Sequence, residues 1–474
     1  MFRQSLGATV HMPADGHAIA SVSIAVNRAF CGRPSSLSTG DSIGALLYQH
    51  HTLTEQPLRT IIADRWGSVD RYCATVTTPF VNNENSLMLA ESWMLRVRPG
   101  LSLAGVGRAL LGLKIAMLLL FVLAVLRGGG SVVVGLGILQ IAAAILEQLL
   151  PVFTYSLYPF LFCLVALTIA WYGLLFGANS QAGATLVTAG IGGVLSAFGT
   201  NVRTSYLPLF AALFVVYLLA SHRRGALPAD GTRRLRLAGA LVCFVLGYAA
   251  FQYVFITRSR PNVNAGASYH PIAHPLVLSL GAPANALSRR EGITWVDGVG
   301  LDLAHRVDPQ AQYLSPEYES ALFRYYRSLW SRYPAEMRQI YLEKFKLAGK
   351  SMIEIAKFER AWMAGVLWLL SYVRNGLWLL ALFAGCAAAF AWRLARSAHC
   401  LDLVACLAAV TGCLLMVESA IIMPFYVLTY DNALLFVCGV STLLVLQLAL
   451  DGAVRLTGRV TGFRLTSAPS AHVA

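Results

Sequence analysis

The run LAGVGRALLGLKIAMLLLFVLAVL, residues 103–126, is the first long apolar stretch of the chain and decides its fold class. A helix of about 20 mostly apolar residues is long enough to cross a bilayer. Eight further runs have the same character, at roughly 131–150, 155–177, 183–199, 205–221, 236–256, 362–392, 402–423 and 433–450. The sequence therefore predicts an all-α fold, a polytopic transmembrane helical bundle.

The composition also indicates a membrane protein. Of the 474 residues 57% are hydrophobic and 13% are charged, and the mean hydropathy is +0.61, whereas a soluble domain carries roughly a quarter charged residues. The formal net charge of +14 would suit a nucleic-acid-binding protein, but the arginines cluster at the ends of apolar runs, where they set membrane topology. We therefore expect membrane lipids as partners and no nucleic acid.

The arginines predict which way the bundle faces. When the spans alternate, three basic segments fall on one side, namely Arg223, Arg224, Arg233, Arg234 and Arg236; Arg393, Arg396 and His399; and Arg455, Arg459 and Arg464. By the positive-inside rule this side is cytoplasmic, so we expect a multi-pass protein of the cytoplasmic (inner) membrane. The short connections on the other side are nearly free of basic residues, with Arg203 as the exception.

This orientation divides the chain into an extracytoplasmic N-terminal region (1–100), transmembrane helices (101–256), an extracytoplasmic, mostly helical loop domain (257–360), further transmembrane helices (361–450) and a cytoplasmic tail (451–474).

A first span should precede the N-terminal region if that region is extracytoplasmic. The best candidate, HAIASVSIAVNRAF (17–30), is short and is interrupted by Asn27 and Arg28, and no signal peptide is visible. Either this span is degenerate, or the natural start lies elsewhere, or the number of spans is off by one.

The nine cysteines show no metal-site spacing, and most of them lie inside apolar runs as small hydrophobic side chains. Cys31 and Cys73 could pair if their region is extracytoplasmic, because disulfides persist there. We expect neither a metal nor a cofactor.

Two consecutive helices are predicted between residues 315 and 360. Ser315, Pro316 and Glu317 supply an N-cap, a proline at the first helical position and an acidic first turn, and Pro334 begins the second helix. Apolar side chains recur at spacings of three and four, namely Tyr318, Leu322, Tyr325, Leu329 and Tyr333, then Met337, Tyr341, Phe345, Ala348, Met352 and Ile355.

The second of these helices is predicted to be basic and amphipathic. Its cations are expected on the faces away from the apolar stripe, namely Arg338, Lys344, Lys346, Lys350 and Lys357. Such a helix either lies in the lipid interface or packs on its own domain with a solvated outer face.

The stretch HPIAHPLVLSLGAPANALSRREGITWVDGVG (270–300) holds several candidate binding groups. His270 and His274 are four residues apart, but a proline follows each and disfavours a helix, and no further zinc ligands are found. We expect them to anchor the loop or to bind substrate through hydrogen bonds. Trp295 and Asp297, framed by glycines, would bind a sugar by stacking and hydrogen bonding; the alternative is an aromatic plug in the loop.

Charged residues near span ends are the other candidates. Arg203, in GTNVRTSYLPLF (199–210), has a planar guanidinium that matches phosphate oxygens, or it is an ordinary interfacial arginine. Carboxylates of Glu147, Glu418 and Asp431 would suit a transporter or proton relay, although solvation at the membrane boundary also explains them.

Four acids precede the first clear span, namely Asp64, Asp70, Glu84 and Glu91. A sugar-transfer enzyme needs one carboxylate as a general base for the acceptor hydroxyl. The spacing of the four does not select one, and the alternative is that all of them are merely solvated.

The layout from about residue 64 to residue 450 resembles the GT-C superfamily of membrane glycosyltransferases, which use polyprenyl-phosphate-linked sugars. It rests on an acid-bearing outer loop before an early span, the Arg-Thr-Ser-Tyr-Leu-Pro start of a mid-chain span and a large outer domain before the last helices. The resemblance implies sugar transfer to an extracytoplasmic acceptor, with Asp64 or Asp70 as the catalytic acid and Arg203 on the donor phosphate. The chain departs from the family pattern in lacking a clear span directly before these acids.

Two other functions stay open. A transporter or flippase for a lipid or small solute would contain internal repeats and helices broken at mid-membrane, for which the glycine-rich segment 189–199 is the candidate. A non-catalytic component of a membrane assembly would use the outer domain as a docking surface and would need no catalytic pair.

The predicted sidedness can be measured directly. Because arginine-rich connections stay in the cytoplasm, we expect a reporter fused after residue 230 to be cytoplasmic and one fused after residue 300 to be extracytoplasmic. Paired fusions to alkaline phosphatase and to green fluorescent protein report the two sides. Finding both positions on one side would refute the orientation.

Overall fold

The computed structural model describes residues 23, 25–32, 43–76, 85–149, 157–176, 182–202, 206–223, 232–257, 272–313, 315–355, 376–397, 399–422, 440–441, 443–445 and 447. Within these ranges the regular elements are helices, and a backbone bridge joins Pro57 to Ser102. The predicted all-α class is confirmed for the described part of the chain.

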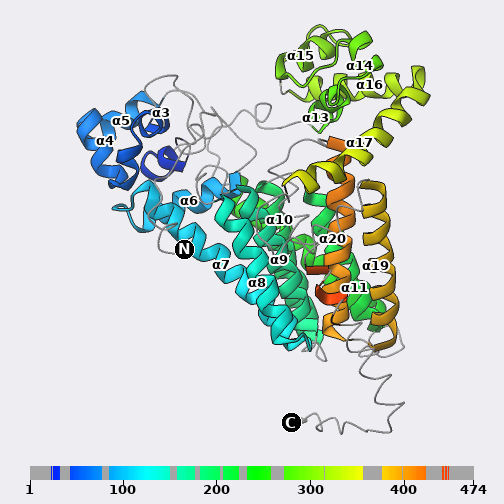
Figure 1. Ribbon diagram of the computed structural model, residues 1–474. Coiled ribbons are helices and arrows are strands. Elements are labelled where there is room, and N and C mark those ends of the chain that lie inside the picture. The colour runs from blue at the N-terminus through cyan, green and yellow to red at the C-terminus, as the bar shows by residue number, and fades with distance from the viewer. Residues whose placement is uncertain are drawn as a thin grey trace, which may run out of the picture.

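Eight of the predicted spans coincide with helices that pack into a bundle (Figure 1). These helices are α7 (Leu103–Arg127), α8 (Val132–Leu149), α9 (Leu157–Phe176), α10 (Ala182–Val202), α11 (Leu207–Arg223), α12 (Thr232–Phe251), α19 (Gly376–Ser397) and α20 (Cys400–Ile422). Five of the described helices are long and apolar enough to cross a membrane, and shorter apolar stretches occur in α8, α9 and α11. Residues 362–375 and most of the predicted span 433–450 lie outside the described residues.

Polar caps set the length of α7. Ser102 accepts a hydrogen bond at its Oγ from the N–H of Gly105 (3.0 Å), which satisfies a backbone donor of the first turn. At the other end the N–H of Gly128 bonds to the carbonyl of Ala124 (2.9 Å). Gly129 then takes a φ of 92°, a left-handed conformation that favours glycine and turns the chain back toward α8.

Contacts between distant segments show which helix ends lie together. Gly128, after α7, lies against the backbone of Leu401 near the start of α20. The Cys400 thiol donates to the carbonyl of Gly173 near the end of α9 (2.9 Å). These residues share one end of the bundle with Arg393, and we call it the arginine end. Both polar regions lie at the opposite end, the domain end (Figure 1).

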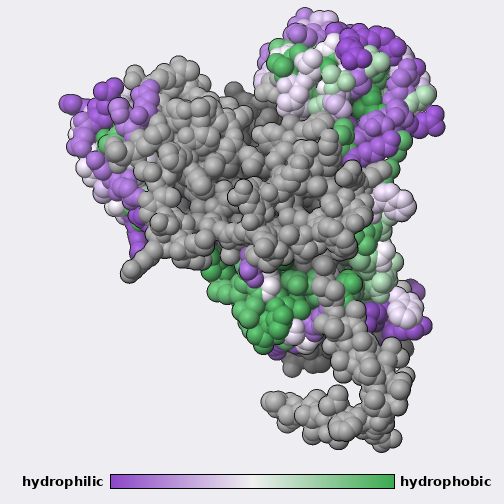
Figure 2. Space-filling view, viewed as in Figure 1, coloured by the Kyte–Doolittle hydropathy of each residue, from purple (hydrophilic) through white to green (hydrophobic). Residues whose placement is uncertain are grey.

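The surface of the molecule changes character along the same axis. Figure 2 shows hydrophilic side chains over the two polar regions and hydrophobic side chains on the bundle below them. Exposed Trp378 and Trp392 lie near opposite ends of α19, and the Arg396 guanidinium lies 3.7 Å from the centre of the Trp392 ring. Tryptophan and arginine in these positions are typical of membrane–water interfaces. The bundle therefore has the character of a membrane-spanning body.

α10 and α12 cross so closely that their backbones touch. A Cβ added to Gly193 would collide with the carbonyl oxygen of Phe244, and one added to Gly247 would collide with the carbonyl oxygen of Gly190. Small residues allow this approach between membrane helices. α10 is one continuous helix through the glycine-rich segment 189–199, so that segment does not form the broken helix which the transporter interpretation requires.

The polar segment after α12 forms a small helical domain with its own core, the outer domain. It consists of α13 (Ala273–Leu278), α14 (Ala286–Glu291), α15 (Asp297–His305) and α16 (Pro316–Arg332), and α17 (Pro334–Ile355) leads from it to the bundle (Figure 1). As predicted, Ser315 caps α16, with its Oγ accepting from the N–H of Tyr318 (3.1 Å). The apolar stripe of α16 is buried at Tyr318, Leu322, Tyr325 and Leu329.

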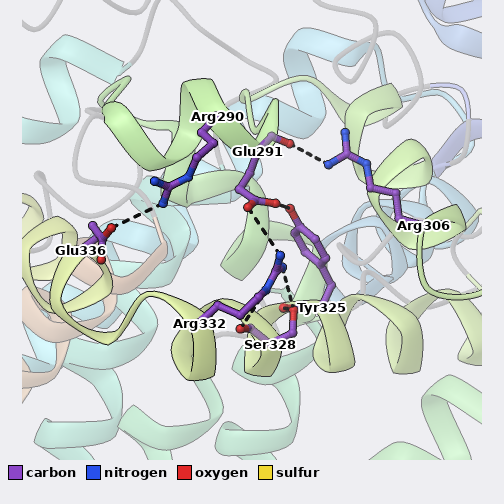
Figure 3. A network of polar contacts seen from close by, with 7 residues as sticks. All are labelled: Arg290, Glu291, Arg306, Tyr325, Ser328, Arg332 and Glu336. Carbon is purple, nitrogen blue, oxygen red and sulfur yellow. Dashed lines mark hydrogen bonds and ion pairs between the residues drawn. The ribbon is translucent and has the colours of Figure 1, made fainter.

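A network of charged side chains fastens α14 to α16 and α17 (Figure 3). The Glu291 carboxylate accepts from the Tyr325 hydroxyl (2.9 Å) and pairs with Arg332 (3.7 Å), while Arg290 pairs with Glu336 of α17 (3.5 Å). Burial, and then the hydrogen bond to Glu291, raise the pKa of Tyr325, so that its hydroxyl stays a donor. These contacts hold the outer domain together.

The sequence prediction for α17 is wrong at one position. Lys344, expected on a solvated face, is completely buried, together with Met337, Ile340 and Ala348. Positions 337, 344 and 348 fall on one face of a helix, so the packed stripe passes through the lysine. α17 also contacts α19 and α20 as well as α16, and it therefore packs on the bundle and not only on its own domain.

The N-terminal region forms a second group of helices, the N-terminal lobe, whose core is continuous with that of the bundle. It contains α3 (Ile43–Gln49), η1 (His51–Glu55), α4 (Leu58–Trp66), α5 (Val69–Thr75) and α6 (Asn85–Val97). A disulfide joins Cys31 to Cys73, the pairing that the sequence left conditional. Asn27, which interrupts the run 17–30, is buried and accepts a hydrogen bond from the Tyr72 hydroxyl.

The close crossing of α10 and α12 predicts an asymmetric response to alanine. Gly193→Ala is expected to lower the free energy of unfolding by about 1–3 kcal/mol, because the added methyl group overpacks the contact. Gly385→Ala on α19, where a Cβ meets open space, is the matched control and should leave stability unchanged or slightly higher, since alanine favours helix. Thermal unfolding in detergent compares the two. Equal unfolding midpoints for the two variants would contradict the close contact between α10 and α12.

Candidate functional site

The two predicted catalytic acids lie on the surface of the N-terminal lobe. Asp64 is on α4 and Asp70 is in the first turn of α5, and both side chains are exposed. α4 and α5 contact each other, so the structure places the two acids on neighbouring helices. Arg203 and His270 lie outside the described residues.

The other predicted binding residues belong to the outer domain. His274 is buried on α13, and its Nδ1 shares a hydrogen bond with the hydroxyl of Tyr318 on α16. Gly300 lies against both rings, where a Cβ would collide. Trp295 is 37% exposed in the loop before α15, and Asp297 begins that helix, with its side chain outside the described part. The contacts of His274 explain its burial structurally, and substrate binding by these residues stays a prediction.

Glu319 shows how the same core positions α13. Its carboxylate accepts hydrogen bonds from the N–H of Ala273 at 3.0 and 3.2 Å, at the N-terminus of the helix. Burial raises the pKa of Glu319, and the backbone hydrogen bonds partly oppose the shift. An acid at a helix N-terminus satisfies free backbone donors, so Glu319 is structural.

Among the four acids before the first span, the structure buries Glu91. Its residue exposure is 8%, whereas Asp64 and Asp70 are open to solvent and Glu84 lies outside the described residues. Glu91 is on α6, which contacts α7, α10 and the π-helical turn η4 (Gln252–Thr257) at the domain end. This carboxylate therefore lies where the N-terminal lobe meets the bundle.

A buried lysine faces this carboxylate from inside the bundle. Lys114 is 7% exposed on α7, about 17 Å along the helix from Leu103. Its charge interacts with Cys163 of α9 and with the Glu91 carboxylate. Within the described part of the chain, no side chain or carbonyl makes a hydrogen bond or ion pair to the ammonium. We call Glu91, Lys114 and Cys163 the junction site.

The junction site has the physical character of an anion-binding site. A charge taken out of water costs several kcal/mol of free energy unless another charge or hydrogen-bond acceptors compensate it. Ionisable side chains within a membrane span are for that reason uncommon, and those that persist mark functional positions. The ammonium of Lys114 can bind an anionic oxygen, and the carboxylate of Glu91 can accept a proton from a hydroxyl group.

Polar groups of the N-terminal lobe surround α6. Arg96 of α6 donates to the backbone carbonyl of Arg28 (2.6 Å), and Ser92 and Arg28 are both buried. Burial raises the pKa of Tyr72, and the hydrogen bond to Asn27 opposes the shift only partly, so the phenol stays protonated. Buried polar side chains therefore accompany the apolar core that joins the lobe to α7.

The candidates chosen from the sequence lie near the ends of apolar runs, whereas Lys114 lies inside one, so the junction site was not predicted. Lys114 was nevertheless visible as a cation inside the run 103–126, and an intramembrane cation is a functional signal by itself. Nothing in the sequence distinguishes Glu91 from the other three acids, since burial of α6 depends on tertiary packing. The part of the chain that the structure describes contains no group of three or more His, Cys, Asp or Glu side chains fit to hold a metal ion.

No protein-family model, no curated protein and no solved structure matches this chain. The chemistry of the junction site is therefore the basis on which we assign a function.

The buried charge predicts an unusual stability effect. Lys114→Met removes a desolvated cation and keeps the length of the side chain, so the ligand-free protein is expected to gain on the order of 1 kcal/mol or to stay unchanged. Thermal unfolding in nanodiscs measures this. Lys346→Met, at an exposed ion pair with Glu343, is the control and should change little. A large loss of stability in Lys114→Met would show that the ammonium is a structural contact.

Proposed function

We propose that the protein is a membrane glycosyltransferase that moves a sugar from a polyprenyl-phosphate donor to an extracytoplasmic acceptor. The observation that carries the proposal is the buried ammonium of Lys114, near the middle of α7. The phosphate of a polyprenyl donor lies at the membrane interface, with its isoprenoid chain in the hydrocarbon. It supplies the anion that such a cation requires.

Two groups of the junction site, Glu91 and Lys114, have a role in this reaction. The acceptor hydroxyl attacks the anomeric carbon of the sugar and gives its proton to the Glu91 carboxylate, which acts as general base. The bond between the anomeric carbon and the phosphate oxygen breaks, and the polyprenyl phosphate leaves with the electron pair. Lys114 stabilises the charge that develops on the leaving phosphate.

The buried carboxylate suits general-base catalysis better than the exposed acids do. Asp64 and Asp70 are surrounded by water, which screens a charge and competes for the acceptor hydroxyl. Glu91 is shielded from bulk water on a helix that contacts α7 and α10, and its charge acts on Lys114. Asp64 and Asp70 stay the alternatives that the sequence resemblance supplies, and Arg203 stays a candidate second contact to phosphate.

The disulfide supports an extracytoplasmic location of the domain end, where this reaction is proposed. Cys31 and Cys73 pair within the N-terminal lobe, at the domain end. Structural disulfides persist in oxidising compartments outside the cytoplasm. The arginine-rich opposite end independently favours the cytoplasm. We therefore propose a cytoplasmic (inner) membrane, with the domain end facing away from the cytoplasm.

A binding experiment tests the phosphate contact. Polyprenyl monophosphate is expected to raise the unfolding temperature of the protein in nanodiscs, whereas polyprenol of the same length should not, because it lacks the anion. Lys114→Met should abolish the difference between the two lipids. Equal stabilisation by both lipids would show that only the isoprenoid chain is bound and would contradict the proposal.

A second experiment identifies the base. In cells that depend on the protein, Glu91→Gln is expected to lower the transfer of sugar to surface glycans by at least about 100-fold, the usual contribution of a general base, while binding of polyprenyl phosphate is retained. Asp64→Asn and Asp70→Asn are measured beside it. If either of these abolishes glycan transfer and Glu91→Gln does not, the base lies on the lobe surface. If none of the three changes the glycans, the protein is not the proposed enzyme.

A further inference from the structure

A second buried lysine lies where three parts of the fold meet. The Lys344 ammonium on α17 donates to the Ser279 Oγ, in the turn after α13, at 2.8 Å. It also donates to the backbone carbonyl of Ile421, in the last turn of α20, at 2.7 Å. Ser279 itself donates to the same Ile421 carbonyl at 3.0 Å. One side chain therefore ties the outer domain, α17 and the domain end of a membrane span together.

The oxygens that hold this cation are neutral. Within the described residues, the ammonium has no carboxylate partner, and its remaining contact is the ring of Tyr341, 5.1 Å from the nitrogen. Lys344 is completely buried. Burial lowers the pKa of Lys344 from its ordinary value to about 7, so the amine changes its charge close to neutral pH.

The ionisable groups on the elements packed around Lys344 do not compensate its charge. Tyr341 on α17 bonds to the hydroxyl of Tyr326 on α16 (2.7 Å), and both are neutral phenols. His274 on α13 bonds to Tyr318. On α20 the ionisable residue nearest to Ile421 in the sequence is the half-buried Glu418, one turn earlier. On α19, the half of the helix at the domain end carries Cys386 as its titratable group.

A serine hydroxyl beside a neutral lysine is also the arrangement of a nucleophile and its base. The burial of this pair excludes that role, because Ser279 and Lys344 are both inaccessible to solvent. The hydroxyl proton is also engaged, since Ser279 donates to backbone carbonyls of Leu276 and Ile421. The geometry is that of a joint and not of an open catalytic site.

We propose that Lys344 is a proton-sensitive clamp that fixes the outer domain to α20, and that protonation of its amine loosens this joint. In the closed joint the neutral amine can donate its two protons to the Ile421 carbonyl and to the Ser279 hydroxyl oxygen. A protonated amine must stay in the same dry position without a counter-charge among the described side chains, which favours an open joint where water reaches the ammonium. The proposal is independent of the function assigned to the junction site.

The direction of the pH effect follows from proton linkage. In an open joint the lysine has its ordinary pKa near 10.4, and in the closed joint it has the lower value of about 7. Between pH 7 and pH 10 the open form binds more protons, so the ratio of open to closed joints falls by up to tenfold for each unit of rising pH. Below pH 7 both forms are protonated and the ratio becomes constant.

Distance measurements on the full-length protein in nanodiscs test the clamp. Spin labels introduced as unnatural amino acids at Ser320 of the outer domain and Trp378 of α19, both exposed, report the open fraction by double electron–electron resonance. We expect the open fraction to rise from pH 9 to pH 7 and then to level off. A distance distribution that does not change from pH 9 to pH 6 would overturn the proposal.

Variants separate the clamp from general effects of pH. Lys344→Met has a similar length and no proton to bind, so it should stay closed at every pH. Lys346→Met, two positions away and half-buried, should keep the wild-type profile. Ser279→Ala removes one acceptor of the ammonium and so lowers the pKa of Lys344 further. The pH below which the open fraction becomes constant should therefore be lower than in wild type. The same pH profile in Lys344→Met as in wild type would refute the clamp, as would covalent labelling of Ser279 by a fluorophosphonate.

Discussion

A charge inside a membrane protein must find a partner, stay near water or lose its proton, and this constraint organises the structure. At the arginine end, Arg393 meets Asp402 and Arg396 lies over an interfacial tryptophan. At the domain end the N-terminal lobe and the outer domain bring polar groups against the bundle. Two buried lysines, Lys114 near the middle of α7 and Lys344 at the domain end, meet the constraint in different ways.

Lys344 is held by two oxygens that belong to the fold, while Lys114 faces a carboxylate without touching it. The first arrangement is complete without a ligand. In the second, the Glu91 carboxylate acts on the ammonium only through space, and the proposed function adds an anionic lipid headgroup as its partner. The same residue type therefore serves one function at a domain joint and another beneath the N-terminal lobe.

The elements of this fold were predictable where local physics decides them. Hydropathy located α7 to α12 and α20 to within a few residues, because a bilayer demands about 20 apolar residues, and Ser315 and Pro334 marked the starts of α16 and α17. The burial of Lys344 was not predictable from its charge, since tertiary packing provided the Ser279 and Ile421 oxygens. Glu91 could not be chosen among four acids for the same reason. Sequence patterns report the faces of helices, whereas the junction site depends on how separate segments meet.

The contact between α10 and α12 limits how a lipid could reach Lys114. Backbones that touch at Gly190, Gly193 and Gly247 leave no width for an isoprenoid tail. The isoprenoid donor of the proposed function would therefore have to enter from the bilayer between another pair of neighbouring helices. The contact between α10 and α12 is closed to it.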